Sequence, residues 1–326
     1  MSELLLDATA GDPIRGTKWT RKTLRKLAEE LRAKKFKVGR ETLRRLLKQL
    51  DYSLRYNRKQ RSKRQDANRD RQMRYLARQR RAFLKAKKPV ISVDCKKKEM
   101  TRTCVTAVGA GVGNFKNAGR TWRREARSVL ATDFPSDAAG KAIPYGVYDV
   151  ARNRGFVGVG VSHETGAFAV SVIRHWWQTE GRAAHPDQTE LLIQADGGGA
   201  NGYRSWLWKW ELQRLADETG LTIMVTHYPT SASKWNWIEH RLFCHISANW
   251  AGEPLLRYET VLKFIRTTTT ATGLSCVAYL DRKRYRTQVK VSPEQKRAIR
   301  LVKHRVLPKW NYTIRPHVPT GRKTDK

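Results

Sequence analysis

Three acidic residues stand out in a strongly basic chain because of where they fall in its apolar stretches. Asp94 ends "PVISVD", Asp196 ends "ELLIQAD", and Glu239 lies about one turn into the helical pattern of "SKWNWIEH". Carboxylates that converge raise one another's pKa, and bound Mg²⁺ would offset that repulsion. Two such ions about 4 Å apart activate an attacking oxygen and stabilise a leaving oxygen at phosphorus. The three acids therefore suggest metal-assisted chemistry on phosphodiesters.

The elements that must position these acids alternate between strand and helix patterns. Strand patterns occur at 89–94, 143–150, 155–162, 190–196 and 221–228, and helix patterns at 164–181, 203–220 and 231–250. An antiparallel start followed by β-α units predicts an α/β fold, a mixed sheet with helices on both faces. If the strands that end at Asp94 and Asp196 are adjacent and parallel, the two acids lie side by side at one sheet edge.

Two further features near these acids have competing explanations. Gly197–Gly199 would leave room for a phosphate beside Asp196, but we favour a permissive turn between strand and helix. Asp149 lies within a strand pattern and is a candidate for a fourth acid of the site, but we do not favour this role.

The charge of the chain predicts a polyanionic partner. The 326 residues carry a formal net charge of +37, and residues 1–88 hold 29 Lys and Arg against 9 Asp and Glu. An excess of this size indicates nucleic acid. We favour nucleic acid over an anionic membrane because the basic segments also carry polar and aromatic residues in a helix-turn-helix-like order.

Two amphipathic patterns near the N-terminus predict a helix-turn-helix. Leucines recur at helical spacing in "LRKLAEEL" and again in "RETLRRLLKQL", with a short turn between them. The second helix would present its basic side chains to a major groove and the flanking phosphates. These side chains are Arg40, Arg44, Arg45 and Lys48. The alternative is a charged, solvated helical hairpin, and the net charge favours DNA.

The chain is therefore divided into four regions. We assign 1–56 to a helix-turn-helix-like DNA-binding region, 57–88 to a basic arm or linker, 89–275 to the α/β domain and 276–326 to a C-terminal appendage. The segment 52–88 contains 15 Lys and Arg and 2 Asp. It is either a helix that lies along phosphates or a mobile basic linker, and both would contribute salt-sensitive affinity.

Polar residues close to the acids are candidates for holding phosphate near the metals. Lys96, Lys97 and Lys98 follow Asp94 directly, and Lys234 and Asn236 precede Glu239 by less than two turns. We predict DNA contacts for all five, with a solvated turn as the alternative for the three lysines.

The cysteines and the hydropathy pattern indicate the redox environment of the protein and whether it spans a membrane. The four cysteines are scattered and form no C-x-x-C pair, which argues against a zinc site and favours a reduced cytosolic environment. No run of about 18 apolar residues occurs, so we predict no membrane span.

Several longer motifs resemble the ISAzo-type insertion-sequence transposases, a family of DDE transposases. They include "VDCKKKE", "GNFKNAGRTW", "DFPSDAAGKAIPYGVYDVARNRGFV", "ADGGGANGYR", "LWKWELQRLADETGL" and "SKWNWIEHRLF", and the resemblance runs from Trp19 to "WNYTI" at 310–314. It implies an RNase H-like catalytic domain in which Asp94, Asp196 and Glu239 are the metal-binding triad.

The resemblance also implies what such a protein acts on. Family members cleave double-stranded DNA at terminal inverted repeats with Mg²⁺ (or Mn²⁺), through two ions, and a 3′-hydroxyl then attacks target DNA. They synapse two DNA ends, so a homo-oligomer on DNA in the bacterial cytosol or nucleoid is expected.

This sequence departs from the family pattern in three places. Cys95 stands where Thr is expected, Met100–Gly111 resembles an insertion, and relatives have more helical sequence before the position of Met1. The alternatives are therefore a truncated or decayed copy that binds DNA without catalysis, or an RNase H-like nuclease that cuts without joining.

Overall fold

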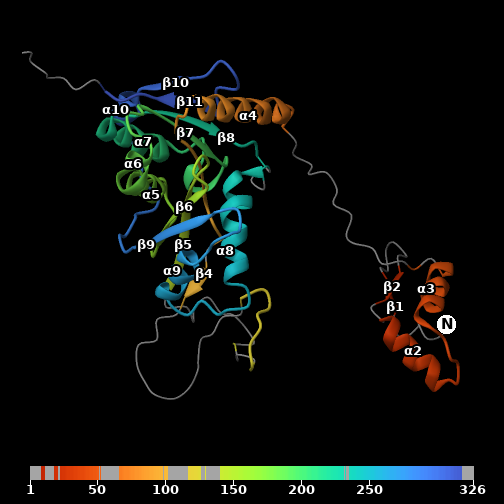
Figure 1. Ribbon diagram of the computed structural model, residues 1–326. Coiled ribbons are helices and arrows are strands. Elements are labelled where there is room, and N and C mark those ends of the chain that lie inside the picture. Colours follow the sequence, from red (N-terminus) through yellow and green to blue (C-terminus); the bar gives the residue numbers. More distant parts are fainter. Residues whose placement is uncertain are drawn as a thin grey trace, which may run out of the picture. The chain divides into compact units, whose positions relative to one another are not determined.

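The structure is a computed structural model of the 326-residue chain. It describes residues 9–11, 18–20, 23–50, 52, 66–97, 99–101, 117–125, 129, 140–230, 232 and 235–317. The chain forms two compact units, Met1–Arg61 and Ser62–Lys326. Each unit is described separately below (Figure 1).

The first unit contains a pair of helices and a short antiparallel strand pair. Its elements are β1 (Thr9–Gly11), β2 (Lys18–Thr20), α2 (Leu24–Ala33) and α3 (Arg40–Gln49). The Thr23 hydroxyl caps α2 by accepting a hydrogen bond from the Lys26 amide at 3.2 Å. Leu27 and Leu43 are fully buried between the two helices. The two helices that the spacing of these leucines predicts are therefore confirmed.

The second unit is built on a nine-stranded sheet in the order β10-β11-β8-β7-β3-β5-β6-β9, with β4 paired to β5. Its strands are β3 (Val90–Cys95), β4 (Glu99–Thr101), β5 (Gly140–Asp149), β6 (Arg154–Gly160), β7 (Glu190–Ala195), β8 (Thr222–His227), β9 (Ser275–Asp281), β10 (Leu301–Lys303) and β11 (Asn311–Ile314).

The direction of the strands decides which residues meet at each edge of the sheet. β3, β7 and β8 are parallel neighbours, whereas β5 is antiparallel to both β3 and β6. β9 is parallel to β6. The carboxyl ends of β3, β6, β7, β8 and β9 therefore all lie at the same edge. The predicted mixed sheet with flanking helices is confirmed.

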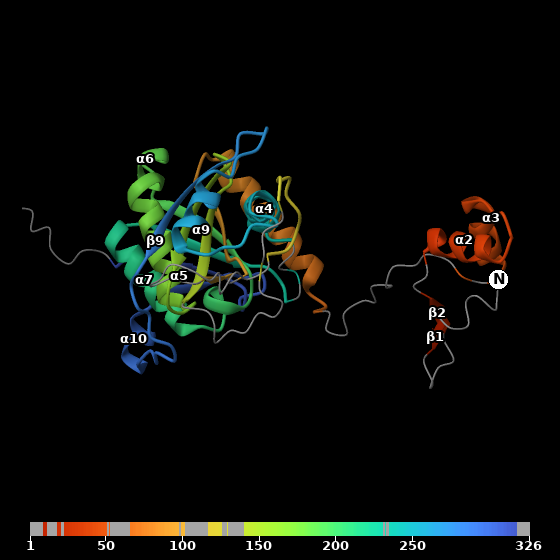
Figure 2. The ribbon, with the colours of Figure 1, turned by 90° about the horizontal axis from the view of Figure 1, so that it is seen from below.

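Helices cover both faces of this sheet (Figure 2). The helical segments are α4 (Arg69–Lys85), α5 (Gly166–Trp176), η2 (Trp177–Gly181), α6 (Arg182–Ala184), η3 (Gly199–Asn201), α7 (Trp206–Thr219), η5 (Glu239–Phe243), α8 (Cys244–Asn249), α9 (Tyr258–Arg266) and α10 (Pro293–Ala298). α5 and α7 bury Phe168 and Leu212 on one face. η5, α8 and α9 bury Phe243, Ile246 and Val261 on the other.

Capping residues explain where the two helices of the first face begin and end. The Thr165 hydroxyl accepts the Phe168 amide at the start of α5, and the Ser205 hydroxyl accepts the Trp208 amide at the start of α7, both at 3.2 Å. α7 ends at Gly220, whose φ of 75° lies in the left-handed region that favours glycine.

The segments on either side of the predicted α/β domain are part of the same compact unit. From the region 276–326, β10 and β11 extend one side of the sheet, and β9 forms its other edge. From the region 57–88, α4 packs against the sheet and buries Gln72, Tyr75 and Leu76. No helix in the described part of the chain is long and apolar enough to span a membrane.

The helix α4 is fixed to the sheet by a buried amide pair. Gln72 Nε2 donates to the His227 carbonyl and to Asn311 Oδ1, both at 2.8 Å. Asn311 Nδ2 donates back to Gln72 Oε1 at 2.7 Å. The Tyr75 hydroxyl lies 2.8 Å from His304 Nδ1, which adds a contact to the chain just after β10.

We expect Gln72→Leu to lower the free energy of unfolding, because the His227 carbonyl and the Asn311 amide lose a buried partner. Each such loss costs about 1–3 kcal/mol. Urea unfolding of the full chain would measure it, with Arg71→Leu on the exposed face of α4 as the control. Equal stability of the two variants would contradict the role given to Gln72.

Candidate active site

Two of the predicted acids leave neighbouring parallel strands at the same edge of the sheet. β3 and β7 are paired with Val93 opposite Ala195. Asp94 and Asp196 are the next residues along each strand, so their side chains come from adjacent positions. Asp94 is buried, with 8% of its surface exposed. The sequence pattern alone anticipates this juxtaposition.

The third acid, Glu239, opens the π-helical turn η5, which is fixed to β3 by Asn236. The Asn236 amide donates to the Val93 carbonyl at 3.1 Å and to Asp94 Oδ2 at 3.3 Å. The Ser92 hydroxyl donates to Asn236 Oδ1 at 2.5 Å and accepts from the Ile238 amide at 3.0 Å. These bonds join the start of the Glu239 helix directly to the strand of Asp94.

Gly146 allows η5 to lie close against the sheet. It is the residue of β5 opposite Asp94. A Cβ atom at this position would lie 2.7 Å from side-chain carbons of both Ile238 and Phe243. A side chain here would therefore displace the turn that carries Glu239.

The acids interact through their charges. Burial is the main cause of a raised pKa for Asp94, and the charges of Asp196 and Glu239 raise it further. Burial also raises the pKa of Asp196, with additional contributions from Glu164 and Glu239. The pKa of Glu239 is raised by burial, and the nearby Lys96 opposes this shift. Without a cation, burial and the neighbouring acids therefore disfavour the ionised forms of these groups.

Glu164 is an acid of this edge that the sequence interpretation missed. It lies in the loop after β6, and its Oε1 accepts a hydrogen bond from the Ala200 amide at 3.2 Å. Its proximity to Asp196 depends on β6 being parallel to β3, a long-range feature that no local motif reveals. The signal available in the sequence was its position after a strand, just before the helix cap Thr165.

The glycine segment after Asp196 forms a tight turn into η3. Gly199 has a φ of 59°, and a Cβ atom there would lie 2.7 Å from Glu164 Oε1. The turn presents Asn201, whose Oδ1 accepts the Tyr145 hydroxyl at 2.6 Å. A hydrogen bond from Asn201 also lowers the pKa of Asp196 against the effect of burial. The favoured explanation, a turn that requires glycine, agrees with this geometry.

A buried chain of hydrogen bonds holds the backbone at Asp196. His227 is fully buried, and burial lowers its pKa to about 4, so the ring is neutral near pH 7. Its Nδ1 lies 2.9 Å from the Asp196 carbonyl, which can only accept, so Nδ1 carries the proton. Nε2 then accepts from the Tyr312 hydroxyl at 3.2 Å, and that hydroxyl accepts from Trp208 Nε1 at 3.0 Å.

The predicted DNA-binding residues occupy very different environments. Arg40, Arg44, Arg45 and Lys48 are exposed on α3, and Arg44 pairs with Glu41 at 2.8 Å. Lys97 is exposed at the end of β3. Lys98 and Lys234 lie outside the described residues.

Two of these predictions require correction. Asn236 is fully buried and is bonded to Ser92 and Asp94, so its side chain cannot contact DNA. Lys96 is 7% exposed, and its ammonium lies 4.4 Å from the centre of the Trp250 ring. Its charge acts on Glu239 inside the site and is not presented on an outer surface.

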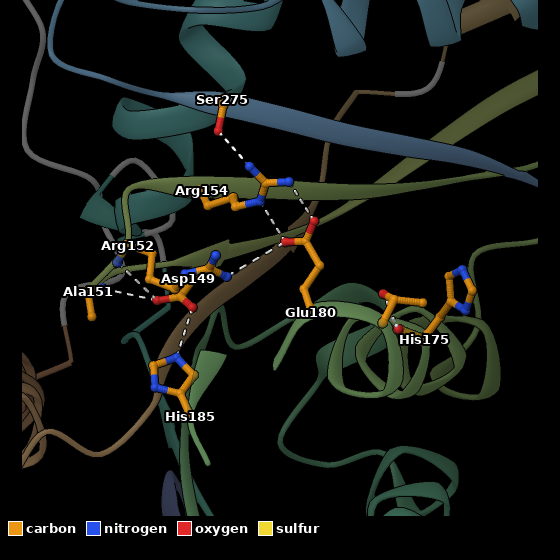
Figure 3. Close-up of polar contacts among 9 residues, drawn as sticks. Asp149, Ala151, Arg152, Arg154, His175, Glu180, His185 and Ser275 are labelled. Carbon is orange, nitrogen blue, oxygen red and sulfur yellow. Dashed lines mark hydrogen bonds and ion pairs between the residues drawn. The ribbon is translucent and has the colours of Figure 1, made fainter. Parts of the chain in front are cut away.

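Asp149 has a structural environment away from this edge (Figure 3). It is paired with Ile91, near the start of β3, and therefore lies toward the opposite end of the sheet. Its carboxylate contacts His185 Nε2 at 3.0 Å and accepts the Ala151 and Arg152 amides at 3.1 and 3.2 Å. Nearby, Arg154 binds Glu180 through two nitrogens. Asp149 is thus not a fourth acid of the site.

The chemistry of Asp94, Asp196 and Glu239 suits a divalent cation. Carboxylate oxygens are the preferred ligands of Mg²⁺, and a bound cation would oppose the rise in pKa that burial and the neighbouring acids cause at Asp94 and Asp196. In the described residues, no three His, Cys, Asp or Glu side chains lie close enough together to form a metal-binding group as they stand. What brings the acids to one region is the register of β3 with β7, which puts Asp94 beside Asp196, and the Asn236 bonds that join the start of the Glu239 turn to β3.

A comparison of the whole sequence with protein families decides the family. The family described as Rhodopirellula transposase DDE domain matches residues 1–316. The chain belongs to this family. No curated protein has significant sequence similarity to it.

Solved structures similar to this DDE-family chain include complexes of the Mos1 transposase. A pre-cleavage Mos1 transpososome has 14% sequence identity and a TM-score of 0.42, covering 75% of this chain and 66% of that one. The Mos1 paired-end complex with left transposon end has 14% identity and a TM-score of 0.41, with 75% and 65% covered. The match thus spans less than two thirds of the Mos1 chain.

We expect Asp196→Asn to stabilise the metal-free protein at pH 8. The substitution keeps the side-chain shape and removes one of the repelling charges, and each unit of raised pKa corresponds to about 1.4 kcal/mol. A raised pKa means that protonation stabilises the fold at low pH and that this stability is lost as pH rises through the folded-state pKa. The advantage of the variant should therefore shrink toward pH 4.

Thermal unfolding with a chelator present would measure this effect. Glu259→Gln, which removes an exposed acid from α9, is the matched control. A variant less stable than the wild type at pH 8 would show that the carboxylates do not repel.

We expect His227→Leu to destabilise the protein, because the Asp196 carbonyl and the Tyr312 hydroxyl lose a buried partner at about 1–3 kcal/mol each. His227→Asn places an amide near the position of Nδ1 and should recover part of the loss. Urea unfolding would compare them. If the two variants lose the same stability, the bond to Asp196 does not contribute.

Proposed function

We propose that this protein is an insertion-sequence DNA transposase that cleaves phosphodiester bonds at terminal inverted repeats and joins the ends to target DNA. The observation that carries the proposal is the placement of Asp94 and Asp196 at the ends of adjacent parallel strands, with Glu239 on the turn that Asn236 joins to β3, in a chain with a net charge of +37. Its membership of a transposase DDE family supports the same activity.

Asp94, Asp196 and Glu239 would hold Mg²⁺ or Mn²⁺, as two ions. The bound ions would activate the attacking oxygen and stabilise the leaving oxygen at phosphorus. The protein supplies the orientation of the ligands. Asn236 directs the Asp94 carboxylate through its amide, and the neutral His227 holds the Asp196 backbone.

Lys96 completes the electrostatics of the site. Its position on Trp250 keeps a buried positive charge near Glu239, which favours the ionised, ligand-competent form of that acid. The strand order, in which β5 runs against the parallel strands on either side of it, supports an RNase H-like catalytic domain.

We further propose that the first unit is a helix-turn-helix that binds the element's ends. Burial of Leu27 and Leu43 leaves Arg40, Arg44, Arg45 and Lys48 exposed on α3, where a major groove and its phosphates would be contacted. Synapsis of two ends would require at least two copies of the chain on double-stranded DNA in the bacterial cytosol or nucleoid.

The proposal predicts that the wild type cuts a labelled duplex carrying the element's own end when Mg²⁺ or Mn²⁺ is added. Asp196→Asn removes a ligand charge and should lower the rate by at least about 100-fold, with DNA binding retained. A second, unlabelled duplex in the same reaction reports strand transfer as a longer labelled product.

Each of the other outcomes would lead to a different conclusion about the activity of the protein or about Asp196. Cutting without joined product would indicate a nuclease. Binding without cutting, by both proteins, would indicate a decayed copy. Equal cutting by the wild type and Asp196→Asn would remove Asp196 from the site.

A further inference from the structure

A strongly basic segment follows β9 at the same edge of the sheet as the candidate active site. We call residues 282–290 the basic loop. β9 is parallel to β6, with Gly160 opposite Asp281. Because β6 and β3 are both antiparallel to β5, β9 runs in the direction of β3. The basic loop therefore leaves the sheet at the edge where Asp94 and Asp196 lie.

The loop is held in place by Tyr285, which is 7% exposed and packs its ring 5.4 Å from that of Phe168. Its hydroxyl donates to Asp281 Oδ2 at 2.7 Å, and its amide donates to the Ser162 hydroxyl at 3.1 Å. Its carbonyl accepts from His163 Nδ1 at 3.1 Å. The Ser162 hydroxyl also donates to the Lys283 carbonyl at 3.1 Å.

These contacts connect the loop to the acid cluster. Ser162 and His163 immediately precede Glu164, which accepts the Ala200 amide and acts on the charge of Asp196. The path from the basic loop to the residues around Asp196 thus consists of one short segment, 162–164. These hydrogen bonds hold the loop backbone at Lys283 and Tyr285 against the segment that leads to Glu164.

The charges themselves are turned outward. Arg282, Lys283, Arg284, Arg286 and Lys290 are exposed. The neighbouring acid, Asp281, is occupied by the Tyr285 hydroxyl and the Lys283 amide. Among the residues that the structure describes, no acid forms an ion pair with Arg282, Arg284 or Arg286. Three guanidinium groups are thus presented to solvent with no ion-pair partner in the described ranges of the chain.

We propose that the basic loop binds the phosphate backbone of duplex DNA beside the bond to be cut. A guanidinium forms paired hydrogen bonds with phosphate oxygens, and its charge replaces the counterions of the duplex. The loop offsets the repulsion between the DNA and the acid cluster on the same edge. This inference rests on the proposed function, and it assigns a DNA contact to a region that the sequence interpretation treats as an appendage.

The test is the salt dependence of DNA binding by the full chain with no divalent metal present. Each phosphate neutralised contributes about 0.9 to the slope of log K against log salt. We expect the triple variant Arg282→Gln/Arg284→Gln/Arg286→Gln to reduce the slope by about 2–3, measured by fluorescence anisotropy between about 50 and 200 mM salt. The triple Arg→Lys variant keeps the charges and should retain the slope.

The matched control removes the same charge from elsewhere on the unit. Arg152→Gln/Arg182→Gln/Arg214→Gln takes three exposed arginines, of which Arg152 adjoins the Asp149 network of Figure 3. The control should leave the slope within about 0.5 of the wild type. An unchanged slope in the loop variant, or an equal fall in the control, would overturn the proposal.

A single-substitution variant and a binding measurement without cleavage allow the proposal to be tested even if another experiment fails. If the triple variant does not fold, as judged by circular dichroism, the single variant Arg284→Gln should still lower the slope by about 0.9. Because binding is measured without cleavage, a chain that proves inactive in the cleavage assay still tests the loop, and the two failures are distinguishable.

Discussion

Repulsion between buried and half-buried carboxylates is the constraint on which the arrangement of this site depends. Asp94 and Asp196 leave adjacent parallel strands at the same level, and burial removes the water that would screen them. Glu164 and Glu239 add charge to the same cluster. A fold does not gain stability from such an arrangement, so the surrounding residues must enforce it, and protonation or a bound cation would relieve it.

The contacts that hold the acids in place come from several elements of the domain. Asn236 fixes the Asp94 carboxylate from the helix side, and Gly146 lets that helix approach the strand. On the other strand, His227 holds the Asp196 carbonyl and is itself fixed through Tyr312 on β11. β11, the last described strand, pairs with β8 and so supports the site. Gln72 on α4 bonds to Asn311 on the same strand.

The parts that could be predicted from the sequence are those with local signals. An apolar run that ends in a single acid indicates Asp94 and Asp196, and a helical spacing of leucines indicates α2 and α3. Glu164 was missed because its place follows from β6 running parallel to β3 through β5. The basic loop was missed because β9 pairs with β6 over more than a hundred residues. Asn236 and Lys96 were assigned to DNA because polarity in a sequence does not reveal burial.

Direct titration with Mn²⁺, followed by electron paramagnetic resonance, tests the central claim that these carboxylates form a cation site. We predict binding by the wild type, and at least about 10-fold weaker binding, or about 1.4 kcal/mol, in each of Asp94→Asn, Asp196→Asn and Glu239→Gln. Glu259→Gln, an exposed acid on α9, should bind as the wild type does. Equal affinity in all five proteins would contradict the account.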